Sequence, residues 1–302
     1  MHNTSSISVK IKIALAVAMI LWASAFVGIR AGLHGYSPGV LALLRFLVAS
    51  VCMFFIYLRL PSRNNINRRD ICRLLLIGAV TLGCYHVPLN YGEQSVSSGI
   101  ASFVISQSPI LTTIFAILFL GERLSLYGLL GMTISFSGMI LILLGQGDGI
   151  KLDIGIFYIL LAAISGSIYS VLQKTFLKKY HAIEVTTYLV WGGTLALLIY
   201  LPALSAEVLH APTHATLAVV YLGVFPGAIA YLAWGYALAS MPASRATNFL
   251  YFMPIMATLL GWMCLGEVPV LFSLLGGVIA LLGVWIVNES YHKAMSQQMV
   301  VD

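Results

Sequence analysis

Long runs of apolar residues, separated by short polar breaks, make up most of the chain. Ten runs are each about 20 residues long, the length of helix that crosses a bilayer. Apolar residues fill each run and do not alternate with polar ones, so the pattern favours helices over the strands of a membrane barrel. The predicted segments are 11–33, 38–58, 72–91, 99–119, 125–145, 154–175, 184–204, 216–239, 244–264 and 270–288.

The breaks are rich in turn-forming residues, and several are very short, as at 36–38, 121–123 and 241–243. Helices joined by so few residues run antiparallel to each other. Composition strengthens this interpretation, because 60% of the residues are hydrophobic and only 9% are charged. A soluble domain carries about 25% charged residues. With a mean hydropathy of +0.96, the sequence predicts an all-α integral membrane protein.

The first run has an alternative interpretation. Lys10 and Lys12 precede a short apolar core and the small residues 23–25, a pattern that also occurs at the cleavage site of a signal peptide. The apolar stretch continues past this point to Leu33, however. A first membrane helix is therefore the favoured prediction.

The placement of positive charge predicts the orientation of the helices. The net charge is +6, and thirteen of the sixteen Lys and Arg residues fall on segments that are cytoplasmic if the N-terminus is inside. By the positive-inside rule, both termini are then cytoplasmic. The basic stretch 59–73 has no interleaved aromatic residues. Topology explains it better than nucleic-acid binding does.

The second half of the chain repeats the first at a shift of 145 residues. Residues 120–138 match residues 265–283 at nine of nineteen positions, and Pro109 and Pro254 fall into the same register. We therefore predict two domains, 1–145 and 146–302, with five helices each. Because five is odd, the second copy enters the membrane from the opposite side. Inverted repeats of this kind occur mainly in transporters, around a site near the midplane.

Three stretches carry a resemblance to a known family. Residues 90–125, NYGEQSVSSGIASFVISQSPILTTIFAILFLGERLS, resemble the signature stretch of the drug/metabolite transporter superfamily, EamA type. Residues 22–26, WASAF, are similar to that family's opening, and the pair Arg45-Phe46 also fits. The resemblance spans the whole chain. It implies ten helices around a central cavity between two inverted halves, and export of amino acids or other small metabolites.

Polar residues inside apolar helices indicate where the substrate would bind. Such residues are costly in lipid, so they are expected to face a cavity or a partner. Some are spaced to share a helix face, as His86 and Asn90 are. The competing interpretation is a structural contact within or between helices. The predicted substrate-cavity residues are Trp22, Ser24, Arg45, His86, Asn90, Gln107, Tyr169, Gln173, Tyr231, Trp234, Asn248 and Tyr251.

Arg45 has two candidate roles. It lies about 10 Å beyond Pro38 at 1.5 Å per residue, where an unpaired charge is costly. It either pairs with Glu93, which is the favoured prediction, or holds an anionic group such as an amino-acid carboxylate. The acidic residues all fall in loops, tails or helix ends. Transport is therefore predicted to be either facilitated diffusion or exchange, or to be coupled to protons through His86.

The repeated phrase Leu-Gly-Glu is predicted to form a hinge or cap in each half. Gly121 and Gly266 suit helix ends. Glu122 and Glu267 come just before the next helix, whose free amides stabilise a carboxylate by about 0.3–1 kcal/mol. We expect a structural role for these four residues.

The sequence as a whole predicts a transporter of the inner (plasma) membrane that exports small polar metabolites, such as amino acids, by alternating access. Import or exchange by the same fold stays open. An enzyme is not predicted, because the chain has no H-E-x-x-H motif and no intramembrane Asp pair. An assembly protein would not need inverted repeats. The expected partners are a small-molecule substrate and the bilayer, without nucleic acid, metal or cofactor, and the oligomeric state is not predicted.

Overall fold

The computed structural model describes residues 8–61, 64, 66–96, 98–122, 125–145, 154–265 and 271–301, and within these ranges the chain is helical without strands. The elements are α1 (Val9–Leu33), α2 (Pro38–Leu58), α3 (Arg68–Gly92), α4 (Ser98–Ile105), α5 (Ser108–Leu120), α6 (Leu126–Gly145), α7 (Ile154–Leu177), α8 (Ala182–Leu197), η1 (Leu198–Tyr200), α9 (Leu201–His210), α10 (Thr213–Val224), η2 (Phe225–Ile229), α11 (Ala230–Ala239), α12 (Ala243–Thr247), η3 (Asn248–Phe252), α13 (Met253–Leu265) and α14 (Leu271–Val301).

Each predicted apolar run falls on one helix or on a series of consecutive helices. Seven helical stretches of the described chain are long and apolar enough to cross a membrane. Four predicted runs are not single α-helices: 99–119 comprises α4 and α5, 184–204 includes η1, 216–239 contains the π-helical turn η2, and 244–264 contains the 3₁₀ turn η3. A membrane protein with multiple apolar helices is therefore confirmed, whereas ten crossings stay a prediction.

Prolines explain three of these interruptions. Pro109 occupies the first turn of α5, Pro226 lies inside η2, and Pro254 occupies the first turn of α13, which begins where η3 ends. Proline has no backbone N–H to donate and its ring crowds the preceding turn, so a continuous α-helix is disfavoured there. Backbone carbonyls released in this way are available to side chains of neighbouring helices.

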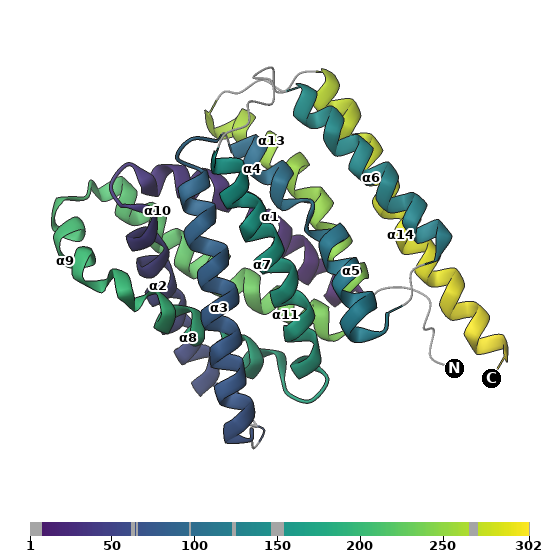
Figure 1. Cartoon of the computed structure of the whole chain (residues 1–302), viewed down its shortest axis with the longest axis horizontal. Helices are drawn as coiled ribbons and strands as arrows, with labels where there is room; N and C mark the ends of the chain where they lie inside the picture. The colour runs from purple at the N-terminus through teal and green to yellow at the C-terminus, as the bar shows by residue number, and fades with distance from the viewer. Residues whose placement is uncertain are drawn as a thin grey trace.

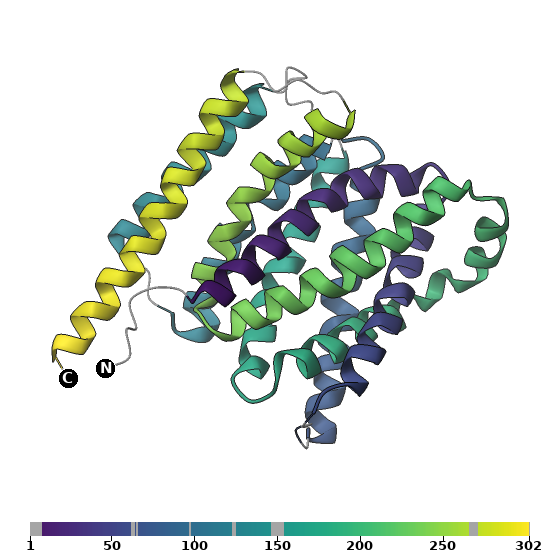
Figure 2. The ribbon, with the colours of Figure 1, turned by 180° about the vertical axis from the view of Figure 1, so that it is seen from behind.

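The helices form a bundle with one pair set to its side. In both views α6 and α14 lie side by side along the flank of the other helices (Figures 1 and 2). Inside the bundle, α3 packs against α7 and α8, α2 against α8 and α10, and α1 against α10, α11 and α13. The outer surface is apolar, with Phe119, Leu126 and Leu209 each more than 70% exposed. A lipid environment accounts for that exposure.

The bundle has two distinct ends. At what we call the His34 end, the ring of His34 after α1 lies 6.4 Å from the ring of His214 in the first turn of α10. At the opposite Lys174 end, α7 finishes and α11 turns into α12. There the Tyr180 hydroxyl donates a hydrogen bond of 2.8 Å to Asp70, which raises the pKa of Tyr180.

Candidate functional site

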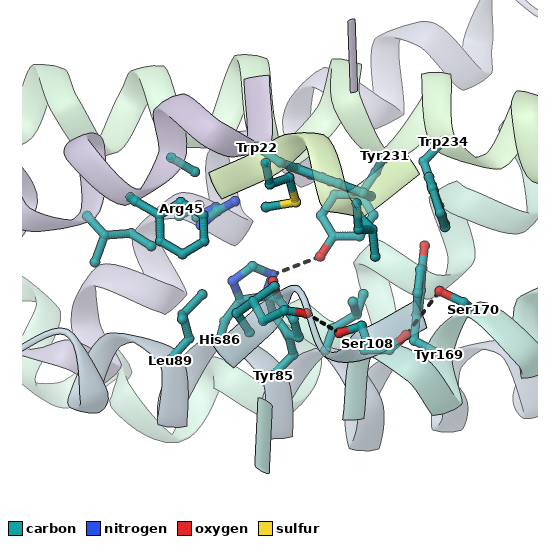
Figure 3. Close-up of a pocket in the computed structure, with 18 residues that line it drawn as sticks. Trp22, Arg45, Tyr85, His86, Leu89, Ser108, Tyr169, Ser170, Tyr231 and Trp234 are labelled. Atoms are coloured by element: carbon teal, nitrogen blue, oxygen red, sulfur yellow. Dashed lines mark hydrogen bonds between the residues drawn. The ribbon is translucent and has the colours of Figure 1, made fainter. Parts of the chain in front are cut away.

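A cavity lies at the centre of the bundle, between helices from both halves of the chain (Figure 3). It leaves about 60 Å³ for the centres of water-sized molecules. That is room for a few waters, so side chains must part before a metabolite enters. The lining residues are Trp22, Ala25, Phe26, Ile29, Arg45, Leu82, Tyr85, His86, Leu89, Ile105, Ser108, Gly166, Tyr169, Ser170, Tyr231, Trp234, Leu250 and Met253.

Aromatic rings form one wall of the cavity. The ring centroid of Trp22 lies 5.4 Å from that of Tyr231 and 5.3 Å from that of Trp234. Tyr169 meets Tyr231 edge to face at 5.7 Å. The Trp22 indole donates a hydrogen bond of 3.2 Å to the carbonyl of Pro226, in the π-helical turn η2. The proline break therefore fixes the orientation of Trp22 at the cavity.

His86 and Tyr231 join the two halves across the cavity. His86 Nε2 and the Tyr231 hydroxyl lie 2.9 Å apart, and both side chains are buried. The His86 ring also packs edge to face against Phe46, at 4.7 Å between centroids. His86 is thus a hydrogen-bonded core histidine and a cavity residue at once, which unites the two interpretations of the sequence.

Arg45 brings an unpaired charge to the cavity. It is 2% exposed, and its Nε and Nη1 atoms have no hydrogen-bond partner. The predicted pair with Glu93 does not form: both Glu93 oxygens lack a partner, and within the described chain no ion pair of 4.0 Å or less involves Arg45. The guanidinium points into the space near Trp22 and His86 (Figure 3).

A second, wider cavity opens at the His34 end. It offers about 720 Å³ to the centres of water-sized molecules. Most of its residues come later along α1, or just beyond α3, than those of the central cavity, so the two cavities lie at successive depths of the bundle. The lining residues are Val27, Arg30, Ala31, Leu33, His34, Glu93, Gln94 and His214.

The Lys174 end is held together by two charged side chains. Lys174 Nζ donates to the carbonyls of Leu238 at 2.6 Å and Met241 at 2.7 Å, at the end of α11. Glu122 accepts hydrogen bonds from the backbone amides of Ala243 at 2.7 Å and Ser244 at 3.1 Å, and also from the Ser244 hydroxyl. The connection between α11 and α12 is thereby fixed from two sides.

Glu122 binds the N-terminus of a helix other than the one that the sequence predicted. It caps α12, 121 residues away along the chain, rather than the helix that follows it. Gly121 has φ of 66°, a left-handed conformation that glycine adopts without strain, and it ends α5. The copies Gly266 and Glu267 lie outside the described residues.

Six of the twelve predicted cavity residues line the central cavity, namely Trp22, Arg45, His86, Tyr169, Tyr231 and Trp234. The structure places the other six in the following contacts: Ser24 with the Tyr221 hydroxyl at 2.6 Å, Asn90 donating to the Pro38 carbonyl, Gln107 to Phe103, Gln173 to Thr186, Asn248 to Ser244, and Tyr251 in a small apolar cluster with Ala280 and Val284.

Sequence reasoning missed the apolar half of the lining, three polar lining residues and Lys174. Tyr85, Ser108 and Ser170 each adjoin a predicted residue along the chain, and that adjacency was an available signal. Lys174 gave no signal, because its acceptors are backbone carbonyls. Among the described residues there is no cluster of three His, Cys, Asp or Glu side chains that could hold a metal ion. What the cavity offers is aromatic surface, one unpaired guanidinium and a hydrogen-bonded His–Tyr pair.

Comparisons with known proteins show what the chain is similar to. Residues 10–144 and 153–289 both match the profile of the EamA-like transporter family. The chain is 42% identical to the uncharacterized transporter YdfC of Bacillus subtilis, over 92% of this chain and 90% of that one. It is 36% identical to a probable terminal-alkyne amino-acid exporter of Streptantibioticus cattleyicolor, over 91% and 92%. A crystal structure shares the fold with a TM-score of 0.75, at 20% identity over 93% of this chain and 99% of that one.

Proposed function

Because the chain belongs to the EamA-like transporter family, we propose that it exports small polar metabolites, with amino acids as the leading class, by alternating access. The central cavity carries the proposal. Arg45, His86 and Tyr231 bring polar groups together inside an apolar bundle, where such groups are costly unless they serve a ligand or a cavity. The relative named as an amino-acid exporter supports both the substrate class and the direction.

The two-halves arrangement, 1–145 and 146–302, belongs to the same proposal. A Cβ atom built on Gly131 would lie 2.8 Å from the carbonyl oxygen of Gly283, and one on Gly138 would lie 2.5 Å from that of Gly276. As one residue number rises the other falls, so α6 and α14 are antiparallel. Gly276 and Gly283 are the 145-residue copies of Gly131 and Gly138. Antiparallel packing of equivalent helices supports inverted repeats.

The difference between the two ends supports alternating access. The Lys174 end is fixed by Lys174 and Glu122, whereas the His34 end contains the wide cavity. A carrier needs one closed and one accessible end in each state, with the substrate site between them. The distribution of Lys and Arg supports a cytoplasmic Lys174 end and cytoplasmic termini in an inner membrane.

Flux measurements with purified protein test this function. Proteoliposomes loaded with a mixture of amino acids should release one or more of them at a saturable rate above that of protein-free vesicles. Trp22→Phe, which loses the hydrogen bond to Pro226 at the cavity, should lower the rate about tenfold, the effect of about 1.4 kcal/mol. Trp191→Phe is the matched control, because this half-buried indole donates to Ser50 away from the cavity. Absence of flux, or equal loss in both variants, would refute the proposal.

Two further measurements address direction and substrate. Comparing the medium of cells with and without the gene identifies which metabolites leave the cell. In the same vesicles, comparing flux with substrate on one side and on both sides distinguishes net transport from exchange, since an exchanger moves labelled substrate only when substrate is present on both sides.

A further inference from the structure

The unpaired Arg45 side chain points to the chemical group that the cavity recognises. Removing one partner of a buried ion pair is strongly unfavourable because it leaves a charge without compensation. Arg45 is in this condition: it is 2% exposed, and its Nε and Nη1 atoms contact no acceptor. An anion in the cavity would supply the missing partner, and the planar guanidinium fits a carboxylate with two parallel hydrogen bonds.

The protein does not supply that anion itself. The described lining of the cavity contains no Asp or Glu. Glu93 forms no ion pair with Arg45, and it lines the wider cavity at the His34 end instead. The site is therefore positively charged overall.

The remaining walls define the rest of the ligand. Trp22, Tyr231 and Trp234 provide aromatic surface on one side, and Leu82 and Leu89 provide aliphatic surface. Such walls suit an apolar or aromatic body. The geometry thus fits a molecule with one carboxylate and one apolar part.

The cavity offers an ammonium group only neutral partners. The hydroxyl groups of Ser108 and Ser170 donate to the carbonyls of Ile105 and Gly166 but keep lone pairs that can accept, and the Tyr169 hydroxyl has no partner. These oxygens and the ring faces can contact a cation, but no carboxylate of the described lining pairs with it. Repulsion from Arg45 opposes these contacts. An amino group on the ligand is consequently tolerated without being required.

We propose that Arg45 binds the carboxylate of the transported molecule, so that the site selects monocarboxylates with an apolar or aromatic body, with or without an amino group. This inference rests on the proposed transport function and extends it to the recognised group. This selectivity distinguishes amino acids from amines and amides of the same shape. The proposed transport function alone does not make that distinction.

Four probes of similar size test the selectivity by direct binding to the purified protein in lipid nanodiscs. L-Phenylalanine and 3-phenylpropionate carry the carboxylate, whereas L-phenylalaninamide and 2-phenylethylamine do not. Isothermal titration calorimetry should detect both acids and should show the amide and the amine to bind at least about tenfold more weakly. Equal binding of the acid and its amide, or no binding of either acid, would overturn the inference.

Substitutions assign the selectivity to Arg45. Arg45→Gln should reduce the preference for the acid over the amide to about one, while Arg45→Lys should weaken acid binding about tenfold because the two-point contact is lost. Arg69→Gln is the control, since Arg69 is exposed and outside both cavities. If Arg45→Gln does not fold, Arg45→Lys decides alone: unchanged acid affinity overturns the inference.

Failure of this inference is distinguishable from failure of the proposed function. The same four probes are loaded into proteoliposomes with the wild-type protein. If all four leave the vesicles equally fast, the protein is a transporter and the role of Arg45 is wrong. If none leaves and amino-acid mixtures are also retained, the proposed function itself is wrong.

Discussion

Glu122 is expected to control the opening of the Lys174 end. Its carboxylate belongs to the first half of the chain, and the amides of Ala243 and Ser244 that it binds belong to the second. These amides start α12, whose first-turn N–H groups have no acceptor within the helix. Replacing Glu122 with alanine removes the cap and the contact between the halves, and it leaves the neighbouring packing in place.

The magnitude follows from two contributions. Loss of an N-cap acceptor costs typically about 1 kcal/mol and up to about 2. Loss of a negative charge at a helix N-terminus costs a further 0.3–1 kcal/mol at an exposed site, and up to about 2 in partly buried geometry. Glu122 is half-buried. A total of about 2–3 kcal/mol follows, which corresponds to about a 30- to 150-fold larger population of the open form.

Cysteine labelling measures that population. Ala246 in α12 is fully buried, so a cysteine at this position reacts only after the end has opened. In a protein freed of Cys52, Cys72, Cys84 and Cys264, the Ala246→Cys variant is treated with a water-soluble maleimide in nanodiscs, where both faces are accessible. When closing is faster than labelling, the rate is proportional to the open fraction. Glu122→Ala should therefore raise the rate about 30- to 150-fold.

Glu207 provides the matched control. Its carboxylate accepts hydrogen bonds from the backbone amide and hydroxyl of Ser37, the N-cap residue of α2, and so has a similar role on another helix. Glu207→Ala should leave the labelling of Ala246→Cys unchanged. The reasoning is refuted if Glu122→Ala changes the rate by less than about threefold, or if Glu207→Ala raises it equally.

Two further predictions concern stability. Gly138→Ala should destabilise the protein by about 1–3 kcal/mol, because a Cβ atom there meets the backbone of α14. Gly83→Ala leaves 3.7 Å between the new Cβ atom and the nearest atom, so it should be neutral or stabilising by up to about 1 kcal/mol. Unfolding of the purified variants measures both changes in stability. Lys174→Met leaves buried carbonyls of the α11–α12 connection without a donor and should lower Tm by about 5–10 °C, whereas exposed Lys178→Met should not.

The helices were largely predictable because long apolar runs have few other folds in lipid. The predicted run 38–58 coincides with α2, and 154–175 differs from α7 by two residues. The interruptions were only partly visible. Pro109 and Pro226 marked two of them, but a π-helical turn depends on contacts from other helices, such as the bond from Trp22 to the Pro226 carbonyl. Hydropathy does not contain that information.

The site was half predictable, and the misses share a physical cause. Periodicity indicates which face of a helix a residue occupies, but not its depth along the pathway. Tyr169 and Gln173 share a face of α7, yet Tyr169 lines the cavity while Gln173, one turn nearer the Lys174 end, donates to Thr186 on α8. Asn90 likewise bonds to Pro38. Polar residues serve packing contacts as often as cavities, and the sequence does not separate the two uses.

The internal repeat nevertheless contains positional information that polarity lacks. Under a two-fold relation between the halves, a residue and its copy 145 positions later touch only where they lie on the axis. Two hydrogen bonds of the described chain join such copies: His86 with Tyr231 at 2.9 Å, and the Ser135 hydroxyl with the Ala280 carbonyl at 3.0 Å. One lies in the central cavity and the other between α6 and α14. The proposed two-fold axis therefore passes through both places, and His86 and Tyr231 are the copies that meet at the proposed substrate site.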